Sequence, residues 1–120
     1  AHALMGPTTV QNIESMHADY CFLSTSGISS MACFHPYQEV AEVKAAMLRS
    51  SEVRVLLIDN SKFGRRALFK FAELGDFDHV VVDAEAPEEE LGRLEAAGVH
   101  VVVAGPRGRR ARRTGAAKRG

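Results

Sequence analysis

The segment VRVLLIDNSKFG, from Val53 to Gly64, constrains the fold more than any other part of this sequence. It begins with a run of apolar and β-branched residues that ends at Ile58. Such a run, bounded by polar residues, is typical of a strand buried on both faces, as in a parallel sheet. It is followed at once by Asp59, Asn60, Ser61 and Lys62. Because ligands bind at the carboxyl ends of strands in open α/β sheets, these residues are a candidate binding site.

Strand and helix patterns alternate along the rest of the chain. Short apolar runs predict strands at Asp19–Ser24, Val53–Ile58, His79–Val82 and Val99–Ala104. Apolar residues at helical spacing predict a helix from Pro36 to Ser50 and a helix that Pro87 opens and Gly98 stops. The first 15 residues have no firm periodicity, but Thr8 or Thr9 can cap a short helix that runs through Met16.

Two stretches between these elements have weaker patterns. Phe63, Ala67, Phe71 and Leu74 recur at helical spacing and predict a short helix, whereas Met31–Pro36 is expected to be irregular. The resulting order implies right-handed crossovers and a parallel sheet with helices on its faces. The expected fold class is therefore α/β, with three α/β/α layers and a mainly parallel sheet.

The charge distribution divides the chain into two parts. Residues 1–106 contain 8 basic and 15 acidic residues, a net charge of −7, and residues 107–120 contain seven basic residues and no acidic ones. The basic segment has no apolar periodicity. We therefore expect one α/β domain at 1–106 and a disordered basic tail at 107–120.

Composition argues against several classes of protein. The largely apolar segment Val99–Ala104, which contains His100, is too short to span a bilayer, and no secretory signal is visible, so a cytoplasmic location is expected. Cys21 lies in an apolar strand pattern, and neither it nor Cys33 has metal-site spacing. No disulfide, metal or other cofactor is expected.

The loop after the first predicted strand is a second candidate site. It begins with Ser24, Thr25, Ser26 and Gly27, and the segment through Ser30 carries five hydroxyl groups. Hydroxyls and backbone N–H groups in such a loop can bind an anion. The alternative is an ordinary Ser/Gly loop whose polar groups serve the fold.

Lys44 and Asp83 also stand in unusual places. Lys44 falls near the middle of the apolar arc of its predicted helix, so it must snorkel, pair with an acid or point into a polar pocket. Asp83 ends the predicted strand His79–Val82, where it provides a carboxylate at the ligand edge or, as we favour, is a cap or near-cap residue of the following helix.

Several of these residues carry a resemblance to a known family. The motif Asp59-x-Ser61-Lys62-Phe63-Gly64 resembles the D-x-S-K-F-G signature of DeoR-type bacterial transcriptional repressors, in their C-terminal sugar-phosphate-sensing domain. Other segments resemble family patterns in the same order and spacing, namely Asp19–Ile28, Glu39–Leu48, Asp78–Asp83 and Ala97–Ala104. The family shares a broad fold group with ribose-5-phosphate isomerase. The resemblance thus implies part of an isomerase/CoA-transferase-like fold.

The resemblance also implies a function and a site. A regulator of this kind binds a phosphorylated sugar or polyol effector and controls DNA binding through a helix-turn-helix domain, which is absent from this sequence; the complete protein is expected to be a homo-oligomer. The implied ligand-binding residues are Ser24, Thr25, Ser26, Gly27, Lys44, Asp59, Ser61 and Lys62. The lysines would supply positive charge to a phosphate, and Asp59 would accept hydrogen bonds from hydroxyls or orient Lys62. No catalytic residue is expected.

Two alternatives come from other functional classes. The first is a sugar-phosphate isomerase, but the loop Thr25–Ser30 lacks the carboxylate that proton abstraction needs. The second is a small α/β module that binds nucleic acid through its arginine-rich tail, without sequence preference and with steep salt dependence.

Overall fold

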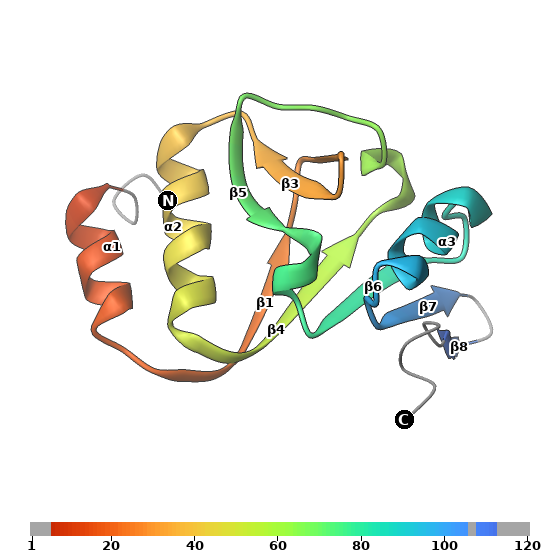
Figure 1. Ribbon diagram of the computed structural model, residues 1–120. Coiled ribbons are helices and arrows are strands. Elements are labelled where there is room, and N and C mark those ends of the chain that lie inside the picture. Colours follow the sequence, from red (N-terminus) through yellow and green to blue (C-terminus); the bar gives the residue numbers. More distant parts are fainter. Residues whose placement is uncertain (1–5, 106–107, 113–120) are drawn as a thin grey trace.

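The computed structural model of the protein describes residues 6–105 and 108–112. It contains a five-stranded sheet of order β1-β4-β6-β7-β8 and a three-stranded sheet of order β2-β3-β5 (Figure 1). The larger sheet consists of β1 (Ala18–Ser24), β4 (Ser51–Ile58), β6 (His79–Asp83), β7 (Val101–Gly105) and β8 (Gly108–Arg112). The smaller consists of β2 (Gly27–Ser29), β3 (Ala32–His35) and β5 (Phe69–Glu73). The helices are α1 (Pro7–Glu14), α2 (Gln38–Arg49) and α3 (Glu88–Ala96), with short 3-10 turns η2 (Asn60–Lys62) and η3 (Leu74–Asp76).

The order of the strands explains where the helices lie. Strands β1, β4, β6 and β7 are parallel, and each joins the sheet beside the one before it. Because crossovers between parallel strands are right-handed, a sheet that grows in one direction receives all its connections on one face. Accordingly, α2, the small sheet and α3 share a single core with the large sheet. The predicted α/β class and the mainly parallel sheet are confirmed.

The core is built on this covered face. Four side chains in register across the parallel strands form one buried row, Leu23, Leu56, Val80 and Val101. Residues from the elements above the sheet complete the cluster, among them Ala41, Leu48, Phe71, Leu91 and Leu94. Burial of each large apolar side chain contributes about 1.5–3 kcal/mol, so this row accounts for much of the stability of the sheet.

The opposite face of the large sheet is largely uncovered by the described residues. Tyr20 and Phe22 of β1 are 62% and 60% exposed, and their stacked rings have centroids 6.3 Å apart. Leu57 of β4 is 44% exposed. The expectation that helices cover both faces, and that Val53–Ile58 is buried on both, therefore differs from the structure. The reason is the one-directional strand order, which sends every described crossover to the other face.

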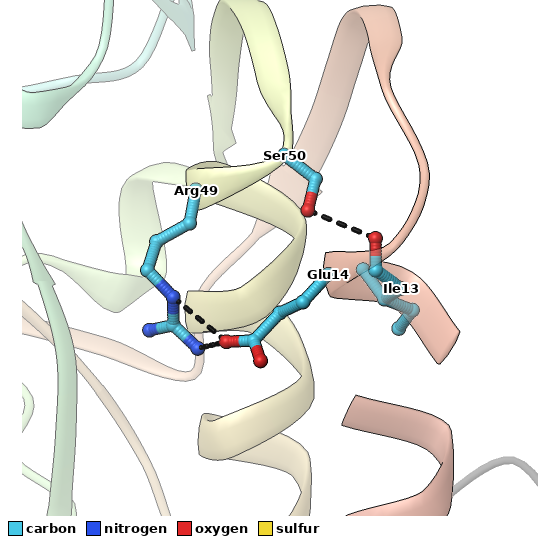
Figure 2. A network of polar contacts seen from close by, with 4 residues as sticks. All are labelled: Ile13, Glu14, Arg49 and Ser50. Carbon is cyan, nitrogen blue, oxygen red and sulfur yellow. Dashed lines mark hydrogen bonds and ion pairs between the residues drawn. The ribbon is translucent and has the colours of Figure 1, made fainter. Parts of the chain in front are cut away.

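Helix α1 packs against α2 at the amino-terminal end of the domain. Figure 2 shows Glu14 of α1 paired with the guanidinium of Arg49, and the Ser50 hydroxyl donating to the Ile13 carbonyl oxygen at 2.9 Å. The ion pair is exposed and contributes at most about 1 kcal/mol. None of the described helices is long and apolar enough to cross a membrane.

Three segments differ from the sequence-based expectations. Ala32–His35 is strand β3 rather than irregular, and Phe69–Glu73 is strand β5 rather than part of a helix, because these two segments pair with each other antiparallel. The basic tail was predicted to be disordered, but Gly108–Arg112 forms β8, antiparallel to β7. That prediction is wrong for these five residues, since all five pair in register with the strand β7. The rest of the predicted tail lies outside the described residues.

Candidate functional site

The predicted site lies at the carboxyl edge of the large sheet. The ends of β1, β4 and β6 are adjacent there, because these strands are parallel neighbours (Figure 1). Two of the predicted segments follow these ends: the β1 loop (Ser24–Gly27) and the β4 turn (Asp59–Lys62). Asp83, at the end of β6, completes the row of strand ends.

The polar groups of the β1 loop are largely used inside the protein. Thr25 is 4% exposed, and its hydroxyl lies 2.8 Å from the carbonyl oxygen of Gly27, to which it donates, and 3.2 Å from that of Phe34. The same hydroxyl accepts from the Gly27 N–H at 3.3 Å, and the Ser26 N–H donates to the Phe34 carbonyl oxygen at 3.2 Å. These bonds hold β2 and β3 to the end of β1. Ser24 is exposed at the start of the loop.

Gly27 is required by a close approach between two segments. A Cβ built on it would lie 2.6 Å from the carbonyl oxygen of Arg65, nearer than side chains and backbone come in proteins. Directly beside it, the Gly64 N–H donates to the Ile28 carbonyl oxygen at 2.8 Å, and Ile28 and Phe63 form a parallel bridge. The backbone after the β4 turn is thus fixed against the β1 loop.

The β4 turn keeps its side chains near solvent. The carboxylate of Asp59 accepts from the Ser61 N–H at 3.2 Å, and its carbonyl oxygen accepts from the Lys62 N–H at 2.9 Å. This capped 3-10 turn explains why the apolar strand stops where it does. Asp59 and Ser61 are exposed and Lys62 is half-buried. Asp59 caps this turn, and in the part of the chain that the structure describes its carboxylate accepts no hydrogen bond from the Lys62 ammonium.

Lys44 reaches the site from α2. Its ammonium donates to the Ser24 carbonyl oxygen at 2.5 Å and lies 5.3 Å from the centroid of the Phe71 ring. Burial lowers the pKa of Lys44, an effect that the nearby Cys33 thiol opposes. Burial, and secondly the charge of Lys44, lower the pKa of His35. A cation held at the end of β1 gives this corner a positive potential that favours an anion.

Asp83 is tied to the β4 turn and does not cap a helix. One carboxylate oxygen, Oδ2, accepts from the Asn60 side-chain amide at 2.9 Å and from the Asn60 backbone N–H at 3.2 Å. Helix α3 has Pro87 at its N-cap, so the cap or near-cap role that we favoured for Asp83 is wrong: Asp83 lies four positions before that residue. Sequence reasoning missed Asn60, whose partner is distant in the sequence.

Two further features stand apart from the eight predicted residues. A cavity of about 350 Å³ lies between the β2–β3 connection and α3, and Ser29, Ser30 and Arg93 are among its lining residues. His17, Asp19 and Glu52 meet near the opposite, amino-terminal edge of the sheet, with ligand-type atoms all within 4.8 Å of one another. All three are exposed, and exposed groups of this kind gather without a metal ion in many proteins. Neither feature belongs to the predicted site.

Comparisons with known proteins agree with the fold. Residues 1–84 match the DeoR C terminal sensor domain. The chain is 33% identical over 101 residues to the HTH-type transcriptional regulator GlpR of Haloferax volcanii, an alignment that covers 83% of this chain and 40% of that protein. It is 26% identical over 100 residues to the HTH-type transcriptional repressor GlcR of Bacillus subtilis, covering 83% and 39% respectively. It is also 33% identical over 86 residues to the glycerol-3-phosphate regulon repressor of Escherichia coli K12, covering 70% and 34%.

The family match covers most of the described domain, from α1 to the end of β6. The chain spans about two fifths of the length of the first two relatives. Matches to several transcriptional regulators extend the similarity beyond residue 84, since they align 99 to 106 residues. With this fold, this strand-end motif and these relatives, the chain belongs to the DeoR C-terminal sensor domain family.

Proposed function

We propose that this chain is the effector-sensing part of a DeoR-type transcriptional repressor and that it binds a phosphorylated sugar or polyol at the carboxyl edge of the large sheet. The observation that carries the proposal is the half-buried Lys44 ammonium, held at the end of β1, the strand that pairs with β4. A half-buried cation with a lowered pKa is stabilised by an anionic partner.

The residues divide naturally between the two parts of such a ligand. Lys44 and Lys62 would supply positive charge to the phosphate, and the exposed hydroxyls of Ser24 and Ser61 would donate to its oxygens. Asp59 would accept from ligand hydroxyls. Thr25, Ser26 and Gly27, predicted as direct ligand contacts, support the proposal differently: the hydrogen bonds of the Thr25 hydroxyl and of the Ser26 and Gly27 backbone shape the loop that carries Ser24.

The relatives favour this ligand class and a regulatory rather than an enzymatic role. Two of them, from Haemophilus influenzae and Escherichia coli, are glycerol-3-phosphate regulon repressors. By analogy, DNA would be bound by a helix-turn-helix domain outside this chain, in a cytoplasmic homo-oligomer. Binding without turnover is the expected behaviour.

A titration of the complete regulator tests the proposal. We expect glycerol 3-phosphate or another phosphorylated polyol or sugar to bind in calorimetry and to change operator binding in a gel-shift assay. Lys62→Met should weaken binding by about 1.5–3 kcal/mol, the value of a charged hydrogen bond. Lys70→Met is the matched control, because Lys70 is an exposed lysine paired with Glu73 on β5.

The result can contradict the proposal in two ways. If Lys62→Met binds phosphate esters as tightly as the parent, the site is wrong. If the protein converts ribose 5-phosphate to the ketose, it is an enzyme of the same fold group and the proposed function fails.

A further inference from the structure

The second carboxylate oxygen of Asp83 has an unusual environment. Its Oδ1 atom is buried, and no hydrogen-bond partner is present for it among the described residues. The other oxygen, Oδ2, accepts from the backbone N–H and from the side-chain amide of Asn60. Asp83 therefore stands at the ligand edge with one satisfied oxygen and one unsatisfied oxygen.

An unpaired buried acceptor destabilises a fold and is uncommon in native proteins. An ionised carboxylate can only accept hydrogen bonds, so Oδ1 requires a donor. A phosphate dianion cannot serve, because the like charges repel, whereas a ligand hydroxyl can. Asp83 is thus suited to bind a hydroxyl group of a sugar or polyol phosphate, whereas the lysines are suited to bind its phosphate.

We propose that Asp83 is a specificity-determining residue that accepts a hydrogen bond from a hydroxyl of the effector. This inference rests on the proposed function and defines the orientation of the bound ligand. The cation Lys44 stands at the end of β1, and Asp83 stands two strands away at the end of β6. The phosphate then lies toward β1 and the hydroxylated carbon chain extends across β4 toward β6.

The strand spacing sets the size of the ligand. Neighbouring strands are about 4.8 Å apart, so the ends of β1 and β6 are separated by about 10 Å. A phosphate ester that contacts both ends needs a hydroxylated chain long enough to cross that distance. Five-carbon and six-carbon phosphates meet this requirement better than three-carbon ones.

Burial of Oδ1 makes the contact depend on a local movement. A hydroxyl can reach this oxygen only when the Asp83 side chain turns or its neighbours shift. Because Asn60 binds Asp83 through both its backbone and its side chain, such a movement is passed to the β4 turn, which carries Asp59 and Lys62.

Binding of matched phosphate esters to the complete regulator tests this inference. The probes are ribose 5-phosphate, glycerol 3-phosphate and propyl phosphate, which carries no hydroxyl. We expect ribose 5-phosphate to bind at least tenfold more tightly than propyl phosphate, and Asp83→Asn to reduce that ratio at least tenfold while propyl phosphate binding stays within threefold. Asp78→Asn is the matched control: its Oδ2 also accepts from a backbone N–H, that of Arg54 at 2.8 Å, at the opposite edge of the sheet. It should leave the ratio unchanged.

The outcomes separate this inference from the proposed function. If the parent binds all three esters equally, or if Asp83→Asn folds and keeps the parental ratio, the inference is overturned while the phosphate site stands. If the parent binds none of the esters, both fail. Should Asp83→Asn not fold, Asn60→Ala replaces it; loss of the amide that orients Asp83 should lower the ratio at least threefold, and an unchanged ratio overturns the inference.

Discussion

The β1 loop and the β4 turn lie side by side at one edge of the sheet, and both are rich in polar residues, yet they differ in how those residues are used. Thr25 in the β1 loop is buried, and its hydroxyl lies within hydrogen-bond distance of the backbone carbonyl oxygens of Gly27 and Phe34. Asp59 and Ser61 in the β4 turn leave their side chains near solvent. The difference shows that a cluster of hydroxyls does not by itself mark a binding surface, because buried hydroxyls are occupied by the fold.

Of the substitutions that test this comparison, we expect the largest loss of stability from one at Gly27. Gly27→Ala places a Cβ 2.6 Å from the Arg65 carbonyl oxygen, and the two backbones must separate. We expect a loss of about 1–3 kcal/mol in the free energy of unfolding, measured by urea denaturation. The control is Gly92→Ala in α3, where nothing lies within 4 Å of the new Cβ. That change should stabilise the protein by up to about 1 kcal/mol, and equal effects would show that the two segments are not in close contact.

A pair of hydroxyl removals comes next. Thr25→Val leaves the carbonyl and N–H groups around Gly27 without their partner and should cost about 1–3 kcal/mol. Ser61→Ala removes an exposed hydroxyl from the β4 turn and should change stability by less than about 0.5 kcal/mol. If both variants have the same urea midpoint, the proposed division between scaffold and surface is wrong.

Alkaline pH gives a third test, on the buried side of the β1 loop. Burial raises the pKa of the Cys33 thiol from 9.0 to about 12, with a smaller opposing effect of its hydrogen bond with Thr25. Since the raised value belongs to the folded state, the stability from the neutral thiol is complete below pH 9 and is lost between pH 9 and about 12. The loss should be about 1.4 kcal/mol for each pH unit in that range. This loss can be isolated by measuring the free energy of unfolding at pH 8 and pH 10 in the parent and in Cys33→Ala. If stability falls equally in both proteins, the raised pKa of Cys33 is contradicted.

The smallest expected effect concerns the two lysines. Lys44→Met keeps the apolar stem over Phe71 and removes a half-buried charge, so stability at pH 7 should stay the same or rise by up to about 1 kcal/mol. Because the folded pKa of Lys44 is lowered, the cost of its charge should disappear as the pH rises from that pKa toward 10.5. Lys62→Met should leave the melting temperature within about one degree. Unfolding of Lys44→Met at 25 °C would assign Lys44 to a structural role.

The sequence predicted the elements whose signals are local. The strands β1, β4, β6 and β7 follow from continuous apolar runs, and the arc of α2 already indicated that Lys44 faces the interior. The small sheet was missed because β3 and β5 are separated by more than 30 residues and only their pairing makes them strands. Phe69 and Phe71 alternate as a strand requires, but the spacing of Phe71 and Leu74 also fits a helix.

The candidate site likewise has features with a local sequence signal and features that depend on distant contacts. The strand end at Asp59 was visible from the abrupt change in polarity, whereas the link from Asn60 to Asp83 joins side chains 23 positions apart. Burial of Thr25 could not be read from a loop of serines, because it depends on Phe34 in a strand that has no clear local pattern.

The contact at Gly27 also has a mechanical consequence. At two successive positions, the chain that leaves Lys62 is fixed to β2: Gly64 by a hydrogen bond to Ile28, and Arg65 by direct contact with Gly27. A free loop would absorb a displacement of Lys62 within itself. Here the displacement is carried into the β2–β3 hairpin, and through β3 into β5 below Lys44. The β4 turn is therefore coupled through these contacts to the small sheet.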